Sequence, residues 1–230
     1  MKVISFCLWG NNPKYTVGAI KNIELAKQYY PDWNCRFYCD NVVPKDIKDT
    51  IKNNDNCELV EVDITGDWKF TTNRFLPFSE TGVEYVISRD TDSRISEREV
   101  AAVEYWIQSG EDAHIMRDHP YHGGFPMLAG MIGIKGGVIK NVSALLSLYK
   151  NQEQYHYDQI FLAKFIYPFI EDSVIVHDEF FNNQPFPTKR QGLDFVGQVY
   201  DHNDEIIEQH HFILKKALEN DNKQSNTLGK

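Results

Sequence analysis

Two aspartates, Asp90 and Asp92, have the residue type and spacing best suited to chemistry, and they directly follow the apolar segment 84–88. If that segment is a strand, both carboxylates lie at the carboxyl end of a sheet strand, where α/β proteins bind their ligands. Mg²⁺ and Mn²⁺ prefer oxygen ligands and bridge readily between protein carboxylates and a diphosphate. An Asp-x-Asp tripeptide also suits a simple acidic turn, but its position after a strand favours a divalent metal site.

Several basic residues accompany these carboxylates. Arg89 and Arg94 flank the pair, Arg74 comes shortly before it, and Lys189 and Arg190 lie in a late loop. Guanidinium groups bind phosphates in a bidentate manner, and they can equally hold carboxylates in place as local ion pairs. We therefore expect Arg74 and Arg89 to contact a phosphorylated ligand, with a local ion-pair network as the alternative for Arg89 and Arg94.

A histidine-rich segment, HIMRDHPYH, brings His114, Asp118, His119 and His122 close together in the sequence. Such a cluster can bind zinc, but it lacks the HExxH spacing on a helix and is interrupted by Pro120. Its donors and acceptors also suit the hydroxyl groups of a sugar. We favour hydroxyl recognition over zinc, with an ordinary surface loop as the remaining alternative.

Three further features can belong to the same site. Gly130 and Gly133 interrupt an apolar segment, which is tolerated where a ligand or a backbone must approach closely, although a packing bulge explains them equally well. Asp158 lies at the start of a predicted helix, where an acidic residue also favours the helix itself. His177 follows the apolar segment 173–176, so it can reach the same metal ion as the two aspartates.

The first hundred residues alternate between strand and helix signals. Asn12 followed by Pro13 predicts a helix to about residue 30. Ser96 and Glu99 form a capping box that opens a helix ending near Gly110. Strands are predicted at 2–8, 35–39, 57–62 and 84–88, with a further helix at 44–54. These repeated units predict an α/β fold, with a mainly parallel, mixed central sheet flanked by helices.

The second half of the chain has weaker signals. The predicted strands there are 114–116, 127–134, 173–176 and 195–199, and the predicted helices are 138–149, 157–165 and 204–218. The sequence contains no repeat and no low-complexity linker. We therefore expect one domain over residues 1–200, a C-terminal helix at 201–219 that packs on it, and a disordered polar tail at 220–230.

Composition argues against several other classes of protein. The chain has 230 residues, a net charge of −9 and a hydrophobic content of 42%, which is typical of a globular protein. It has no long basic run, so we expect neither a nucleic-acid partner nor a polybasic membrane anchor. No apolar stretch approaches the roughly 18 residues of a transmembrane segment. The N-terminus is typical of a strand, and the four cysteines lack zinc-type spacing, so we expect a cytoplasmic protein with reduced thiols.

These features together resemble the nucleotide-sugar-dependent glycosyltransferases with the GT-A fold. A Rossmann-like first half, a strand ending in Asp-x-Asp, the segment AGM, a helix with Asp-Gln and a late His follow one another in this order. The order is similar to that of galactosyl- and glucosyltransferases related to glycogenin. The motifs SRDTDSRISERE and HIMRDHPYH are closer to a group of small glycosyltransferases of bacteria and large viruses. The resemblance covers about residues 1–200 and implies a single-domain GT-A fold.

The resemblance also implies roles for individual residues. Asp90 and Asp92 would contact a divalent metal, Mn²⁺ or Mg²⁺, and the ribose or diphosphate of the donor, with His177 as a further metal ligand. Asp118 or Asp158 would face the reacting sugar. The remaining donor contacts would come from the exit of the first strand and from the late loop, through Phe6, Leu8, Trp9, Asn11 and Lys189.

The expected reaction is transfer of a hexosyl group from a nucleoside diphosphate sugar, with a UDP-sugar favoured, to a hydroxyl of a glycan or protein-linked glycan. Retention and inversion at the anomeric centre both remain open. A sugar nucleotidyltransferase is one alternative, but the first strand exits into CLWGNNPKY and not into a glycine-rich basic phosphate loop. A non-catalytic carbohydrate- or nucleotide-binding module is another. Because the chain is small, a homodimer could complete the acceptor site.

Overall fold

A mixed sheet forms the centre of the protein, whose computed structural model describes residues 1–63, 65, 68–149, 156–181 and 183–228. The order across the sheet is β3-β2-β1-β4-β6-β5-β7. In chain order the strands are β1 (Lys2–Leu8), β2 (Trp33–Cys39), β3 (Cys57–Glu61), β4 (Tyr85–Ser88), β5 (Ala113–Arg117), β6 (Ile132–Lys135) and β7 (Val174–Asp178). Strand β6 is antiparallel to both of its neighbours, whereas the other pairs are parallel. The predicted mainly parallel, mixed α/β sheet is confirmed.

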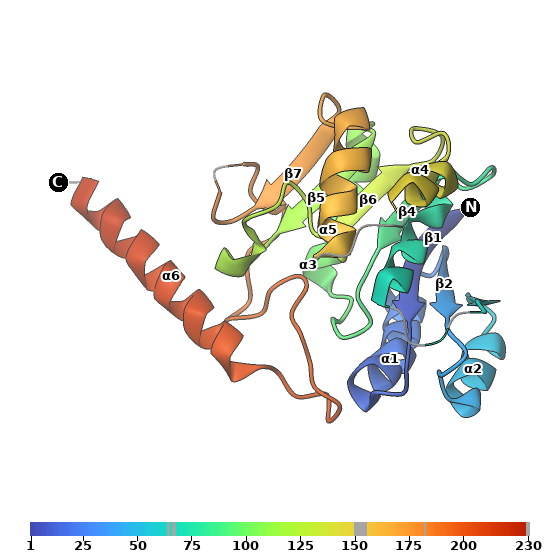
Figure 1. Cartoon of the computed structure of the whole chain (residues 1–230). Helices are drawn as coiled ribbons and strands as arrows, with labels where there is room; N and C mark the ends of the chain where they lie inside the picture. Colours follow the sequence, from blue (N-terminus) through green and yellow to red (C-terminus); the bar gives the residue numbers. More distant parts are fainter. Residues whose placement is uncertain (64, 66–67, 150–155, 182, 229–230) are drawn as a thin grey trace.

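Helices cover both faces of this sheet (Figure 1). The helices of the chain are α1 (Pro13–Tyr29), α2 (Lys45–Lys52), α3 (Glu97–Ser109), α4 (Val142–Tyr149), α5 (Tyr157–Phe161) and α6 (Glu208–Leu228), of which α6 extends beyond the sheet. They are joined by the 3₁₀ segment η1 (Trp68–Ser79), the 3₁₀ turns η2 (Pro120–His122) and η4 (Tyr167–Phe169), and the π-helical turn η3 (Leu162–Ile166). Successive residues of β1 point to opposite faces, as in any strand. Val3 therefore packs into the core with η1, α4 and α5, and Ile4 into the core with α1, α2 and α3.

Local signals account for the two helices that flank the central strands. Asn12 Oδ1 accepts a hydrogen bond from the Lys14 N–H (3.0 Å), and Pro13 occupies the first turn, where its missing N–H does no harm. Ser96 Oγ accepts from the Glu99 N–H (3.3 Å), and Gly110 ends α3 with a φ of 80°. Both helices begin and end where these signals predict.

The second half of the chain differs from the prediction in segments whose structure depends on long-range contacts. Within the apolar segment 127–134, the strand begins only at Ile132. The Ala129 N–H donates to Gln159 Oε1 (3.1 Å) and not to a neighbouring strand. The segment 195–199 contributes only the isolated bridge from Ser93 to Val199 in place of the predicted strand. The predicted helix 157–165 divides into α5 and the π-helical turn η3.

The C-terminal helix α6 begins at Glu208 and continues to Leu228, past the predicted end at 219 and through residues 220–228 of the expected disordered tail. Residues 229–230 of that tail lie outside the described residues. Its first turns contact the body, where His119 Nε2 lies 3.0 Å from the His210 carbonyl oxygen and His211 Nε2 lies 3.2 Å from Gln198 Oε1. Beyond these contacts α6 runs away from the sheet (Figure 1). Among the described residues, no helix combines the length and apolarity needed to cross a bilayer.

Candidate active site

The two predicted metal ligands lie just beyond the carboxyl end of β4, in the middle of the sheet. The side chain of Asp90 is 48% exposed and that of Asp92 is 15% exposed. Lys14 Nζ, from the first turn of α1, lies 2.7 Å from Asp92 Oδ2. The sheet therefore presents one open and one sheltered carboxylate at the edge where the sequence predicts them.

The two carboxylates lie close enough for the charge of Asp90 to change the pKa of Asp92. Burial, and then the charge of Asp90, raise the pKa of Asp92 above its ordinary value, although Lys14 acts in the opposite direction. Burial alone would lower the pKa of Lys14, but its hydrogen bond and attraction to Asp92 outweigh this and raise it. Two carboxylates that repel each other in a partly buried site are stabilised by a cation.

A buried arginine joins Asp90 to a carboxylate from a distant part of the chain. Arg74, from η1, donates through Nη1 to Asp90 Oδ1 and through Nη2 to Asp158 Oδ2 (2.9 Å). Its side chain is 5% exposed, and the charges of Asp90 and Asp158 raise its pKa despite the opposing effect of burial. Arg74 is thus held between the carboxylates of Asp90 and Asp158. Its position in the sequence had suggested a contact with a phosphate.

The loop before β6 lies directly against Asp90. A Cβ atom added to Gly130 would stand 2.0 Å from Asp90 Oδ2, so this position has no room for a side chain while Asp90 keeps its place. Gln159, next to Asp158, fixes the same loop through its hydrogen bond to the Ala129 N–H. The structure therefore brings together Asp90, Gly130 and Asp158, which the sequence analysis had singled out separately.

Helix α1 holds the segment that carries the aspartates, through two residues that the sequence analysis missed. Asn22 Nδ2 donates to the carbonyl oxygens of Thr91 (3.3 Å) and Ser93 (2.8 Å), and its Oδ1 accepts from the Ile95 N–H (3.2 Å). A Cβ on Gly18 would stand 1.9 Å from the Thr91 carbonyl oxygen. A glycine inside a helix and a buried asparagine on its apolar stripe are both unfavourable without such contacts, and they were the available signal.

At the end of β1, the loop residues have accessible side chains, whereas the side chains of the last strand residues are buried. The side chains of Phe6 and Leu8 are fully buried in the core, and Phe6 stacks on Phe37 at 4.7 Å between ring centroids. Their side chains are enclosed by the protein, so the predicted donor contacts of Phe6 and Leu8 could be made only by their backbone. Trp9 is half-buried and Asn11 is exposed, so both remain available at this edge of the sheet.

A buried aspartate that the sequence analysis did not select organises this exit. Asp40, at the end of β2, accepts through Oδ1 from the N–H groups of Gly10 (3.2 Å), Val42 (3.0 Å) and Val43 (3.0 Å). It ties the loop after β1 to the loop after β2. An aspartate between a strand and a turn, as in YCDNVVP, was the available signal.

The guanidinium group of Arg89 is bonded to other groups of the protein. It is buried, and its Nε donates to Glu99 Oε1 (2.7 Å) while its Nη1 donates to the Ser88 carbonyl oxygen (2.7 Å). Glu99 is itself 2% exposed. The structure thus has Arg89 in the local ion pair that was the alternative interpretation, enclosed with Glu99 between β4 and α3, and its contact with a donor phosphate stays a prediction.

The carboxylate of Asp118 is likewise bonded to other groups of the protein. Its fully buried carboxylate accepts from Arg98 Nε (2.8 Å) and Nη2 (3.0 Å), from Arg190 Nη2 (2.6 Å), and from the Val196 N–H (2.9 Å). These donors fill the positions at which a substrate hydroxyl would bind. Of the two predicted catalytic carboxylates, Asp158 shares the Arg74 cluster and Asp118 does not.

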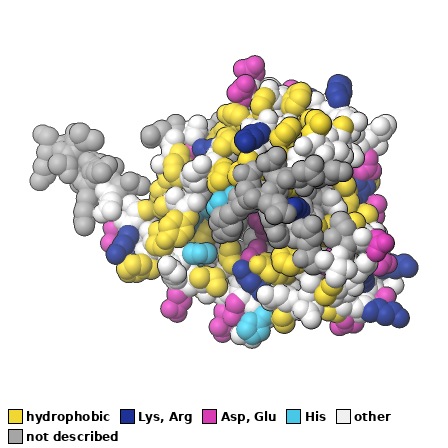
Figure 2. All heavy atoms as spheres, in the orientation of Figure 1, with side chains coloured by type: hydrophobic (Ala, Val, Ile, Leu, Met, Phe, Trp, Pro, Cys, Tyr) yellow, Lys and Arg dark blue, Asp and Glu magenta, His cyan; other side chains and the backbone are white. Residues whose placement is uncertain are grey.

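The histidines do not assemble with the aspartates. His177 lies on β7, three strands from β4, which corresponds to about 14 Å at the usual strand spacing. Its Nδ1 is 2.8 Å from His114 Nε2, and burial lowers its pKa to about 4. His119 and His122 pack beside each other near the base of α6, where the ring of His119 also contacts that of His210. Figure 2 shows several histidine side chains at the surface of the body.

This arrangement does not bring the histidines together as metal ligands, either for the predicted role of His177 or for the disfavoured zinc site. Among the residues that the structure describes, no group of three or more His, Cys, Asp or Glu side chains could hold a metal ion. This applies both to zinc in the histidine-rich segment and to the set of Asp90, Asp92 and His177. Lys189 also lies elsewhere, exposed in a groove whose lining includes neither Asp90 nor Asp92.

Comparison with known proteins gives a likeness of the fold. No protein-family model matches the chain, and no curated protein matches it. A solved glycosyltransferase involved in the glycosylation of the major capsid of PBCV-1 is similar over 79% of this chain and 82% of its own, with 18% identity and a TM-score of 0.51.

Two other solved structures share this fold. A Bacillus anthracis protein described as a glucose-1-phosphate thymidylyltransferase has 10% identity and a TM-score of 0.52, over 77% of this chain and 86% of its own. A 4-diphosphocytidyl-2C-methyl-D-erythritol synthase from Anaerococcus prevotii has 15% identity and a TM-score of 0.50, over 82% of this chain and 92% of its own. The chain therefore has the Rossmann-like fold of the GT-A glycosyltransferases, in the form of a single sheet flanked by helices.

Proposed function

We propose that this protein is a glycosyltransferase that moves a hexosyl group from a nucleoside diphosphate sugar to a hydroxyl group of a glycan or protein-linked glycan. The observation that carries the proposal is the cluster of Arg74, Asp90 and Asp158 beside Asp92, at the carboxyl edge of a GT-A sheet. Ligands of open α/β sheets bind at this edge. A UDP-sugar is the favoured donor because of the family that the sequence motifs resemble.

The two aspartates fit a divalent metal that also binds the donor. Asp90 is half exposed, and burial together with the negative charge of Asp90 raises the pKa of Asp92. Mg²⁺ is commonly held by one or two protein carboxylates together with substrate phosphates, so two carboxylates suffice here. When bound, Mn²⁺ or Mg²⁺ would supply Lewis-acid stabilisation of the leaving diphosphate.

The side chains around this pair have separate tasks in the proposed reaction. Lys14 adds a positive charge next to Asp92, on the side of the site formed by the start of α1. Arg74 orients Asp90 and Asp158 relative to each other, as a buried guanidinium with two fixed partners does. Trp9 and Asn11 are the residues of the β1 exit that remain available to the nucleotide base and ribose.

Asp158 is the carboxylate that we assign to the reacting sugar. It is 20% exposed and lies in the Arg74 cluster, whereas Asp118 is enclosed by arginine donors. In an inverting reaction, its free oxygen lone pairs would accept the proton of the acceptor hydroxyl as the new bond forms. In a retaining reaction, the leaving phosphate would take that proton, and Asp158 would position the sugar.

The fold also supports a second candidate, a sugar nucleotidyltransferase, because a protein described as a thymidylyltransferase has the same architecture. The exit of β1 argues against it. Gly10 donates to Asp40, and the next residues form the N-cap of α1, so this loop does not have a run of free glycine N–H groups for a triphosphate. A binding module without turnover is the remaining alternative.

The setting of the reaction is also a proposal. All four cysteines are free, which suits the reducing cytoplasm. A homodimer could complete the acceptor side of the site near Asp158. Light scattering of the purified chain tests that association.

Calorimetry tests the donor site directly. UDP, GDP, CDP and ADP are titrated with and without Mn²⁺ into the wild type and Asp92→Asn, which has nearly the same shape but no charge. We expect metal-dependent binding of UDP that the variant loses. Incubation with UDP-sugars then separates a transferase, which releases UDP, from a binding module. Release of pyrophosphate from UTP and a sugar 1-phosphate would favour the nucleotidyltransferase. No binding of any nucleotide would overturn the proposal.

A further inference from the structure

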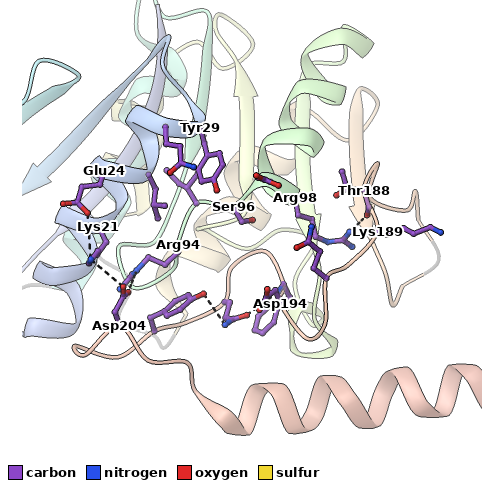
Figure 3. Close-up of a pocket in the computed structure, with 18 residues that line it drawn as sticks. Lys21, Glu24, Tyr29, Arg94, Ser96, Arg98, Thr188, Lys189, Asp194 and Asp204 are labelled. Atoms are coloured by element: carbon purple, nitrogen blue, oxygen red, sulfur yellow. Dashed lines mark hydrogen bonds and ion pairs between the residues drawn. The ribbon is translucent and has the colours of Figure 1, made fainter.

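A groove lies away from the Arg74 cluster, between α1, the start of α3 and the loop 188–204 (Figure 3). Its volume of about 680 Å³ is within the range of about 300–1,000 Å³ that is usual for small-molecule sites. One wall is a stripe of α1, and the opposite wall is the late loop that contains Thr188 and Asp194. Figure 3 shows side chains from the three segments turned toward this common space.

The charges in this groove balance and are largely paired within the protein. Four basic and four acidic side chains line it. Arg94 Nε donates to Asp204 Oδ1 (2.8 Å), and Arg98 donates to Asp118 and to Glu179. A site for a phosphate or another strong anion would need uncommitted guanidinium groups. Both guanidinium groups of the groove are therefore engaged by protein groups, which makes the groove less suited to a strong anion.

The remaining lining has the chemistry that recognises neutral sugars. Tyr29 and Tyr200 are partly exposed and present aromatic surface, against which the apolar face of a sugar ring can pack. Gln28, on the α1 wall, and Gln191, on the loop wall, are exposed and supply amide donors and acceptors suited to hydroxyl groups. We infer that this groove binds a neutral oligosaccharide, and, resting on the proposed function, that it anchors the glycan whose acceptor hydroxyl reaches the donor site.

The floor of the groove is continuous with the segment that carries the metal ligands. The Tyr200 N–H donates to the Asp92 carbonyl oxygen (2.9 Å), and the Arg94 guanidinium lies over the Tyr200 ring at 4.9 Å. Arg94 Nη1 also donates to the Thr91 carbonyl oxygen (3.3 Å). A glycan in the groove would thus rest on residues bonded to the Asp-x-Asp backbone, which is why we assign it to the acceptor and not to an unrelated ligand.

The test uses the full chain on a printed array of defined neutral and anionic oligosaccharides, followed by calorimetry with the neutral oligosaccharide that gives the strongest signal. The groove variant is Gln28→Ala/Gln191→Ala, and the matched control is Gln108→Ala/Gln209→Ala, at exposed glutamines outside the groove. We expect binding of a neutral oligosaccharide that the groove variant weakens about tenfold or more, as the loss of two hydrogen bonds predicts. The control should bind like the wild type.

Several outcomes would overturn the inference. These are binding of anionic glycans alone, binding of no glycan, and equal affinity of the groove variant and the control. Calorimetry with UDP and Mn²⁺ on the same samples separates this inference from the proposed function. Asp92→Asn should lose the nucleotide and keep the glycan, and the groove variant should do the reverse. Glycan binding without any nucleotide binding by the wild type would refute the donor site and leave the groove as a carbohydrate site.

Discussion

Gly130 lies so close to Asp90 that a methyl group on its α-carbon would stand 2.0 Å from Asp90 Oδ2. The loop between β5 and β6 therefore sets the orientation of an aspartate just beyond the end of β4, although it contributes no charged side chain at this point. This contact makes the geometry of the proposed metal site depend on a residue with no functional group.

We predict that Gly130→Ala disables nucleotide and metal binding at a small loss of stability. The half-exposed Asp90 side chain can turn away from the new methyl group, so the fold survives and the carboxylate is misplaced. The affinity for UDP and Mn²⁺ should fall by about tenfold or more, which corresponds to at least about 1.4 kcal/mol.

The matched control is Gly82→Ala, at a turn where φ is 88° and the space around the Cβ position is open. It should lower the free energy of unfolding by about 1–2 kcal/mol through backbone strain and leave UDP binding unchanged. Equal UDP affinity of Gly130→Ala and wild type would contradict the role that we give to the contact.

Asp158→Asn should lower the rate of sugar transfer much more than donor affinity. The amide keeps an oxygen for the Gln159 N–H, which Asp158 Oδ1 now accepts at 2.9 Å, but it is a poor proton acceptor. Loss of a general base typically lowers kcat by about 10²–10⁴-fold. Steady-state kinetics and UDP calorimetry give the two quantities. A weakened UDP affinity with unchanged kcat would assign Asp158 to donor binding through Arg74.

Asp118→Ala should act on stability. It removes the buried carboxylate shared by Arg98 and Arg190, which leaves Arg190 without its carboxylate partner and Arg98 with Glu179 alone. Breaking a buried pair in this way costs about 3–5 kcal/mol, which urea denaturation measures. A variant with wild-type stability and a selectively reduced kcat would return Asp118 to the list of catalytic groups.

The pair of His177 and His114 should make the protein sensitive to acid. Burial lowers the pKa of His177 from 6.5 to about 4, so between these values the unfolded chain binds a proton that the folded chain does not. The part of the folding free energy that depends on a neutral His177 is therefore fully present above about pH 6.5 and is lost as the pH falls toward 4. Each such proton gives a slope of up to about 1.4 kcal/mol per pH unit.

The variant His177→Asn isolates this contribution. Its unfolding free energy should depend less steeply on pH between 6.5 and 4 than that of the wild type, because it lacks the titrating ring. Urea denaturation at several pH values compares the two slopes. Parallel curves would show that His177 takes up its proton equally in the folded and unfolded chains.

Binding of Mn²⁺ should weaken as the pH falls, since the metal needs ionised carboxylates. The pKa of Asp92 is raised by burial and by Asp90, so this loss should occur at a higher pH than for an ordinary aspartate. Lys14→Met removes a group that lowers this pKa and should move the midpoint further upward. Calorimetry of Mn²⁺ with UDP over a pH series measures the midpoint, and a downward shift would contradict the assigned coupling.

The sequence predicted those parts of the molecule whose signals are local. Asn12 and Pro13 open α1, and Ser96 and Gly110 delimit α3, because capping depends on residues within one turn. The Asp90 and Asp92 pair could be placed at a strand end for the same reason. Long-range contacts could not be predicted in this way. Arg74 meets Asp158, which is 84 residues distant, only after η1 and α5 pack on the same face of the sheet.

The same limit explains the errors. Asp118 looks like a catalytic carboxylate until Arg190, 72 residues further along the chain, is placed against it. His177 follows an apolar segment as Asp90 does, but strand order cannot be inferred from spacing, and β7 lies at the edge of the sheet. Residue types and local patterns define the set of candidates, and the pairing of distant elements decides which of them meet.

The reversed direction of β6 has one more consequence. Because β5 runs toward the active edge and β6 runs back from it, the segment 118–131 leaves the sheet and returns to it at the same edge. Its length can change without altering the register of any strand. Insertions or deletions in the middle of this segment, between Asp118 and Gly130, would change the surface beside Asp90 and leave both of these residues and the strand pairing in place, so this part of the loop is where the site could be engineered.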